Sequence, residues 1–190
     1  EQPAERPAKG GKTPRMNDAV KASSITALQE DEEIRFPTGM GELDRVLGGG
    51  AVKGSLVLVG GAPGIGKSTL MLQICQQLGS TCKVLYVSGE ESARQLKLRA
   101  KRLSVDSENL FVLSETRLGD VLECVRRETP DVLIVDSIQT LYNEELDAPA
   151  GGVGQVKDCT MALYGISRSY VSRIEKKALA KLEEALQGRI

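Results

Sequence analysis

The chain of 190 residues contains no histidine and no tryptophan, and aromatic residues make up only 3% of it. Its four cysteines are scattered and form no C-x-x-C pair. Without histidine or paired cysteines, we expect no structural zinc site. Three of the cysteines lie in apolar or helical stretches, which is typical of small core residues in a reducing cytosol. The cysteines are Cys75, Cys82, Cys124 and Cys159.

The sequence also lacks a signal peptide and any apolar run long enough to span a membrane, so we expect a soluble, cytoplasmic protein without a membrane partner. The formal net charge of −1 does not indicate a nucleic-acid partner for the whole chain, so any basic surface has to be local. Apolar residues make up 41% of the chain, which is enough for a hydrophobic core. Because the chain begins with Glu1 rather than methionine, we expect a fragment.

One segment, residues 61–69, carries a specific chemical signature. It matches the phosphate-binding pattern G-x-x-x-x-G-K-[ST], between an apolar run and a helical pattern. Its glycines let backbone N–H groups turn toward a polyphosphate, and the following helix adds the positive end of its dipole. We expect Lys67 to reach the β and γ phosphates of ATP and the Ser68 hydroxyl to bind Mg²⁺. The alternative is a glycine-rich turn without a ligand. The expected nucleotide contacts are Gly61, Ala62, Pro63, Gly64, Ile65, Gly66, Lys67, Ser68 and Thr69.

Apolar runs alternate with helical patterns along the middle of the chain. We expect strands at 56–60, 83–88, 110–113 and 131–136, and helices at 42–47, 67–78, 92–103 and 118–128. This alternation predicts an α/β fold with a parallel sheet flanked by helices on both sides. Residues 1–33, rich in Pro, Lys, Glu, Ser and Gly, are predicted to be a disordered leader. Residues 143–158 have the composition of a loop.

Polar residues follow two of these strands. Asp136 ends the strand at 131–136, where a carboxylate can bind Mg²⁺ together with Ser68; alternatively, it caps the next turn. Glu90 or Glu91, after the strand at 83–88, can supply a base for hydrolysis, or both acids can belong to a helix N-cap. Gln139 can sense the γ-phosphate or be an ordinary loop residue.

Several blocks in order resemble one family closely. The chain is similar, from about residue 34 to 162, to the ATPase core of bacterial RadA/Sms, a RecA-like family in DNA repair and recombination. The blocks are 36–39, 42–50, 54–58, 61–69, 86–92, 97–100, 133–140 and 154–160. The resemblance implies a DNA-dependent ATPase that works as a homo-oligomeric ring on single-stranded or branched DNA. It also implies that Lys67, Ser68 and Asp136 hold Mg-ATP, with Lys67 and Glu90 as the catalytic pair. Ala62 departs from the aspartate that is frequent in the family.

Other parts of the family pattern are missing from this sequence. The family's four-cysteine zinc finger would precede Glu1, and its remaining core strands, its Lys-Asn-Arg-Phe-Gly motif and its protease-like domain would follow residue 162. We therefore expect a truncated P-loop NTPase sheet that is short of strands and has an unpaired edge.

The last segment, 163–190, resembles a different family. Residues 165–179 are similar to the turn and recognition helix of the helix-turn-helix in sporulation-type RNA polymerase sigma factors, region 4. In that arrangement Gly165 makes the turn, Ile166, Val171 and Ile174 face inward, and residues 156–164 supply the supporting helix. A junction is expected near Leu163. The residues expected to face duplex DNA are Ser167, Arg168, Ser169, Ser172 and Arg173.

Three hypotheses follow. The first is an ATP-binding, DNA-dependent ATPase of the RadA type. The second is a sequence-specific DNA-binding module of the sigma-factor type, carried by the tail. The third is a truncated fusion product that is inactive.

Overall fold

The computed structural model describes residue 24 and residues 34–166 of the chain. The chain divides into two compact units, Glu1–Glu32 and Glu33–Ile190, and nearly all described residues belong to the second. The predicted leader at 1–33, except for Ser24, and the tail residues from Ser167 onward lie outside the described residues. The disordered leader and the DNA-facing tail therefore stay predictions.

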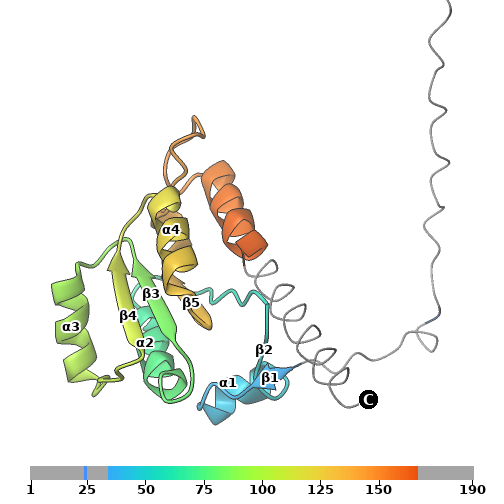
Figure 1. Cartoon of the computed structure of the whole chain (residues 1–190), viewed down its shortest axis with the longest axis vertical. Coiled ribbons are helices and arrows are strands. Elements are labelled where there is room, and N and C mark those ends of the chain that lie inside the picture. Colours follow the sequence, from blue (N-terminus) through green and yellow to red (C-terminus); the bar gives the residue numbers. More distant parts are fainter. Residues whose placement is uncertain (1–23, 25–33, 167–190) are drawn as a thin grey trace, which may run out of the picture. The chain divides into compact units, whose positions relative to one another are not determined.

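The centre of the second unit is a parallel sheet of three short strands, β3 (Val84–Ser88), β4 (Leu110–Ser114) and β5 (Val132–Asp136). The strands lie in the order β4-β3-β5, with β3 paired to both neighbours (Figure 1). All five residues of β3 are buried, as expected for a central strand covered on both faces. The predicted parallel α/β sheet is confirmed, and among the described residues one edge of β5 carries no strand.

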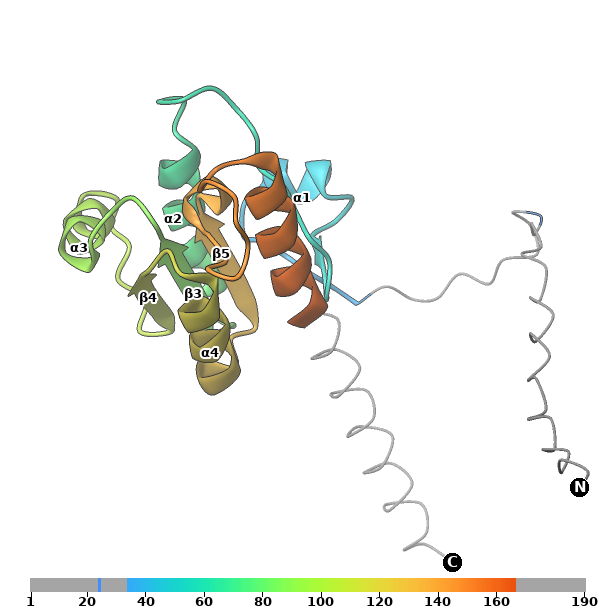
Figure 2. The same ribbon diagram turned by 90° about the horizontal axis from the view of Figure 1, so that it is seen from above.

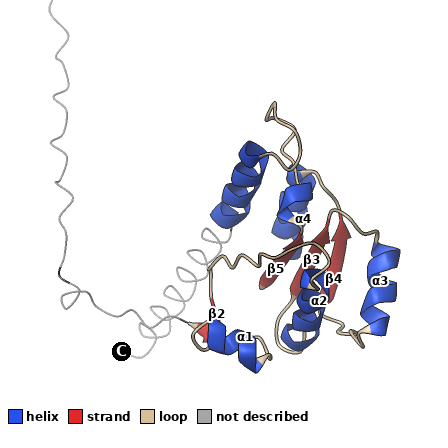
Figure 3. Cartoon of the chain, turned by 180° about the vertical axis from the view of Figure 1, so that it is seen from behind, coloured by secondary structure: helices blue, strands red, loops and turns tan. Residues whose placement is uncertain are grey.

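Helices cover both faces of this sheet. Successive side chains of a strand point to opposite sides, so the apolar residues of β3 contribute to a separate cluster on each face. Val84 and Tyr86 of β3 pack into one apolar cluster with α2 (Lys67–Leu78) and α3 (Ala93–Arg102). Leu85 and Val87 pack into a second cluster with α4 (Leu118–Glu128) and a helical stretch at 153–166. Figures 2 and 3 show this layering of helices around the three strands. The bounds of α2 and α4 are those predicted from the sequence.

A small hairpin precedes the phosphate loop. The strands β1 (Arg35–Phe36) and β2 (Ala51–Val52) pair antiparallel, and the short helix α1 (Gly41–Val46) lies between them in the chain. The Asp44 carboxylate accepts hydrogen bonds from the backbone N–H and the hydroxyl of Thr38, at 2.8 and 2.7 Å. These bonds hold the turn that leads into α1.

The prediction of a strand at 56–60 is wrong. Residues 55–62 have no regular secondary structure, and Leu58 is 83% exposed. Leu56, Val57 and Val59 are exposed as well. A strand is stabilised by side-chain packing against its neighbours, and the described residues provide no further strand to cover this segment on its outer side. Tertiary context therefore overrides an apolar, β-branched sequence.

Two predictions near the end of the described chain also need correction. Residues 153–158, expected to be loop, form the first part of the helical stretch at 153–166. Two buried residues hold this stretch in place. Cys159 packs into the second cluster, and Gln155 donates a hydrogen bond to the carbonyl oxygen of Asn143 in the adjoining loop. The turn expected at Gly165 is absent, because the helix continues through Ile166, which packs on the same cluster. The supporting helix expected at 156–164 is present. No helix among the described residues is long and apolar enough to span a membrane.

Candidate nucleotide-binding site

The phosphate loop has the backbone that its glycines predict. Gly64 and Gly66 adopt φ angles of 77° and 103°, in the left-handed region that favours glycine. A Cβ atom at either position would meet no atom within 4 Å, so conformation rather than crowding calls for glycine. The helix α2 begins at Lys67, directly after Gly66. The unpaired N–H groups of its first turn are therefore available to an anion at the exposed loop.

Lys67 closes over this loop. Its Nζ donates hydrogen bonds to the carbonyl oxygens of Gly61 and Ala62, at 2.9 and 3.0 Å. Ser68 and Thr69 follow in the first turn of α2 and are half-buried. A positive charge and a hydroxyl group are thus placed at the start of one helix, as required to hold phosphates and their cation.

The start of α2 and the ends of the strands lie at the same edge of the sheet. A short connection, residues 79–83, joins the end of α2 to the beginning of β3, so α2 runs antiparallel to the strands. Twelve helical residues span about 18 Å and five strand residues span about 16 Å. The helix therefore returns the phosphate loop to the carboxyl edge, where Asp136 ends β5 in register with Ser88 of β3.

The Asp136 carboxylate is held in place by a tyrosine. The hydroxyl group of Tyr86, a buried residue of β3, donates a hydrogen bond of 2.5 Å to Oδ2 of Asp136. Burial, reinforced by this bond to Asp136, raises the pKa of Tyr86 far above its ordinary value, so the phenol remains a donor at physiological pH. Sequence reasoning did not assign this role to Tyr86. A lone tyrosine within the otherwise apolar run at 84–87 was the available signal, because a buried hydroxyl group needs a partner.

The two acids after β3 have different surroundings. Glu91 forms an ion pair with Arg99, with 2.6 Å between Oε1 and the guanidinium nitrogen. Glu90 is exposed, and its Oε1 accepts a hydrogen bond of 3.3 Å from the Ser137 hydroxyl, next to Asp136. The predicted N-cap is also present, since Ser92 caps α3 in a capping box with Gln95. Glu90 is thus the acid that faces the end of β5.

A close backbone approach brings the strand ends together. A Cβ atom added to Gly89 would lie 1.9 Å from Oγ1 of Thr140 and 3.1 Å from Cγ2 of Thr116. Thr140 belongs to the 3₁₀ helix η2 (Ile138–Thr140), which follows β5 and also carries the exposed Gln139. Ser88–Ser92 and residues 114–116 line a pocket of about 240 Å³ beside this contact. Only glycine at position 89 allows the loops after β3, β4 and β5 to meet.

These residues fit a magnesium nucleotide. Mg²⁺ takes oxygen ligands, and in nucleotide sites it is held by one or two protein oxygens together with the phosphates. Ser68 and Asp136 offer such oxygens at one edge of the sheet, and Lys67 offers a cation for the phosphates. No cluster of three or more His, Cys, Asp or Glu side chains that could hold a metal ion occurs within the described ranges. The phosphates and water molecules would complete the coordination of a bound Mg²⁺.

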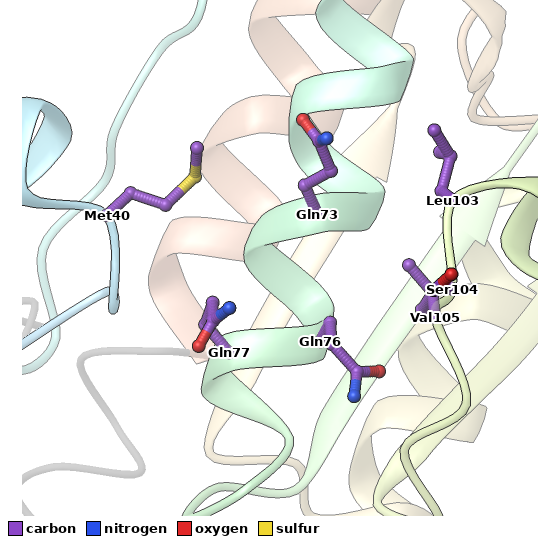
Figure 4. Close-up of a pocket in the computed structure, with 7 residues that line it drawn as sticks. All are labelled: Met40, Gln73, Gln76, Gln77, Leu103, Ser104 and Val105. Carbon is purple, nitrogen blue, oxygen red and sulfur yellow. The ribbon is translucent and has the colours of Figure 1, made fainter.

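A second pocket, of about 280 Å³, lies on the outer side of α2 (Figure 4). Gln76 links α2 to the segment after α3: its Oε1 accepts from the N–H of Asp106, and its Nε2 donates to the Asp106 carboxylate. No charged side chain lines this pocket, so it offers no acid, base or phosphate-binding cation. Its lining residues are Met40, Gln73, Gln76, Gln77, Leu103, Ser104 and Val105.

Comparisons with known proteins show what the chain is similar to. A family model described as "ATPase: KaiC" matches residues 36–121. The protein named DNA repair protein RadA from Listeria monocytogenes is 53% identical over 149 residues, which is 78% of this chain and 33% of the relative. Its counterpart in Bacillus subtilis is 51% identical over 150 residues, 78% of this chain and 33% of the relative. The RadA of Campylobacter jejuni is 51% identical over 157 residues, 80% of this chain and 35% of the relative.

The chain thus spans about a third of the length of the curated relatives it matches. The matched family model covers residues 36–121 and so includes the phosphate loop. The described core therefore has an α/β fold with a parallel sheet flanked by helices, consistent with a RecA-like P-loop domain, and it is similar in sequence to part of the proteins named DNA repair protein RadA.

Proposed function

We propose that this chain binds Mg-ATP at residues 61–69 and hydrolyses it in a DNA-dependent manner. The observation that carries the proposal is the location of the phosphate loop at the start of α2, at the same sheet edge as Asp136. The RadA name of the relatives supports DNA as the partner, because DNA repair is part of that name.

Each site residue has a role in this proposal. Lys67 exchanges the carbonyl oxygens of Gly61 and Ala62 for β and γ phosphate oxygens when nucleotide binds. Ser68 and Asp136 hold Mg²⁺, which offsets the negative charge of the phosphates when bound. The remaining residues of 61–69 contact the phosphates through backbone N–H groups.

Glu90 acts as the base that orients or deprotonates the attacking water. Its carboxylate is exposed and lies beside Ser137, whereas that of Glu91 is occupied by Arg99. Gln139, exposed in η2 directly after β5, senses the γ-phosphate. The substrate partner is single-stranded or branched DNA, the working form is a homo-oligomer ring, and the location is the cytoplasm.

The first experiment is the thermal shift of the whole chain on addition of Mg-ATP. A ligand that binds only the folded state stabilises it by about 2.7 kcal/mol at a hundredfold excess over Kd. We expect a clear rise in Tm for the wild type and none for Lys67→Ala. Lys157→Ala is the matched control, because it removes one exposed lysine from the helix at 153–166 and should respond like the wild type.

The rate of ATP turnover, measured with and without single-stranded DNA, then tests the proposed DNA-dependent hydrolysis. We expect DNA to increase turnover, and Glu90→Gln to lower turnover while leaving the Mg-ATP thermal shift intact. Equal thermal shifts for the wild type and Lys67→Ala would refute nucleotide binding at this loop. The absence of a cooperative unfolding transition would instead indicate an inactive product.

A further inference from the structure

The outward face of α3 is basic along its whole length. Residues spaced three and four apart share one face of a helix, and here that face consists of four cations around one leucine, which is 50% exposed. Leu96, on the opposite side of α3, is buried in the first apolar cluster. We call these exposed residues the α3 basic face: Arg94, Lys97, Leu98, Lys101 and Arg102.

The cations of the α3 basic face differ from most other cations of the described residues in their surroundings. Within the part of the chain that the structure describes, none of the four forms an ion pair. The fifth cation of the helix, Arg99, pairs with Glu91 on a different side. Other cations also lie beside carboxylates, as Arg45, Lys83 and Arg117 do. The α3 basic face is therefore a local positive surface on a chain whose formal net charge is −1.

Helix stability explains only part of this pattern. Cations in the last turn of a helix interact favourably with its dipole, which accounts for Lys101 and Arg102. Arg94 lies in the first turn, where a cation is unfavourable, and that turn contains no acid. The helix α3 itself consists of ten residues and contains five cations and no acid. The helix dipole therefore does not account for the positive charge at the start of α3.

We propose that the α3 basic face contacts the phosphate backbone of DNA. This inference rests on the DNA-dependent function proposed above and assigns the contact to the core rather than to the tail. From Arg94 to Arg102 the face extends about 12 Å, at 1.5 Å per residue. That length corresponds to about three to four base-pair steps of duplex DNA at 3.4 Å of axial rise each. The face contains no aromatic side chain to stack on bases, so binding there is independent of sequence.

The test is fluorescence anisotropy of the whole chain with labelled oligothymidine over a range of salt concentrations. The variant Lys97→Ala plus Lys101→Ala removes two cations and keeps a good helix former at both positions. The control, Arg126→Ala plus Arg127→Ala, removes the same charge from the exposed surface of α4. Each lost phosphate contact on single-stranded DNA changes the slope of log K against log salt by about 0.7.

We expect the α3 variant to bind on the order of 20-fold more weakly at about 0.1 M salt, with a slope shallower by about 1.4. The control should match the wild type, and the Mg-ATP thermal shift should be unchanged in both variants. Equal losses in the α3 variant and the control would overturn the inference, because net charge alone would then explain binding. Unchanged binding in both would overturn it too, and would leave the proposed function intact if the wild type binds DNA.

A loss of binding only in Arg168→Ala plus Arg173→Ala would assign the contact to the tail instead and refute the role of α3. A wild-type chain that does not bind oligothymidine would refute the DNA-dependent function itself, and the inference with it. The two failures can be told apart, because DNA binding by the wild type tests the proposed function, whereas the difference between the α3 variant and the control tests the role of α3.

Discussion

The close contact between Gly89 and Thr140 makes a sharp prediction about one methyl group. In Gly89→Ala the new Cβ would overlap the Thr140 side chain, whose Oγ1 and Cβ would lie 1.9 and 2.5 Å away. That side chain cannot turn aside without loss, because its hydroxyl donates a hydrogen bond of 2.7 Å to the Ser137 carbonyl oxygen. The N–H of Gly89 also donates to the Asp136 carbonyl oxygen at 3.2 Å, which ties the backbone of β3 to that of β5.

The expected loss of stability comes from overpacking, because neither the Gly89 backbone nor the Thr140 side chain can move freely. Forcing a methyl group into such a contact costs about 2–3 kcal/mol. For a domain of this size, 1 kcal/mol corresponds to about 3–5 °C in Tm, so Gly89→Ala should lower Tm by about 6–15 °C. ATP turnover should fall further than ATP affinity, because the displaced loop carries Glu90 away from Ser137.

The control is the same substitution at Gly119, in the first turn of α4. A Cβ atom there would meet nothing within 4 Å, and the backbone is helical. Because alanine is the better helix former, Gly119→Ala should stabilise the fold by about 0.5–1 kcal/mol and raise Tm by a few degrees. Thermal unfolding followed by circular dichroism measures both variants. Shifts of the same sign and size would refute the packing argument.

Three further predictions concern single side chains. Tyr86→Phe should destabilise the fold by about 1 kcal/mol in chemical denaturation, since it removes the hydrogen bond to the half-exposed Asp136. The Arg117 N–H and a second backbone N–H lower the pKa of the Glu115 carboxyl from its ordinary value of 4.5. The stability that this carboxylate contributes is present above pH 4.5 and is lost as the pH falls through the lower pKa of the folded state. Glu115→Gln should therefore weaken the dependence of Tm on acid pH. Burial raises the pKa of Cys75 to about 12, so its thiol should resist iodoacetamide in the native chain at about pH 8.

Each of these has a control. Tyr142→Phe, which removes the hydroxyl group of a half-buried tyrosine outside β3, should cost less than Tyr86→Phe. Equal costs would speak against the Asp136 bond. Glu108→Gln, at an exposed acid, should leave the acid limb of the Tm profile unchanged. Cys82 is half-exposed and should be alkylated first, and labelling of Cys75 at the same rate would show that the first apolar cluster opens readily.

Local patterns were sufficient for most of the secondary structure. The apolar spacing of α2 and α4 and the apolar run of β5 predicted those elements within a residue of their bounds. The start of α2 directly after the glycine-rich residues 61–66 was also predicted correctly, since residue type dictates the left-handed conformations of Gly64 and Gly66. Pairing was a different matter. The segment at 56–60 has the composition of a strand, but it lies outside the sheet, and no strand among the described residues covers its outer side.

The sequence by itself determined the α/β alternation, the glycine-rich loop before α2, the acids after β3 and the acid that ends β5, because each depends on residues close together in the chain. Only the tertiary structure decided which acid is tied up by Arg99, which tyrosine holds Asp136, and why position 89 must be glycine. It also decided that residues 153–158 are helical rather than loop. These features arise from contacts between segments distant in sequence, whose free energy depends on packing and partner geometry rather than on local propensity.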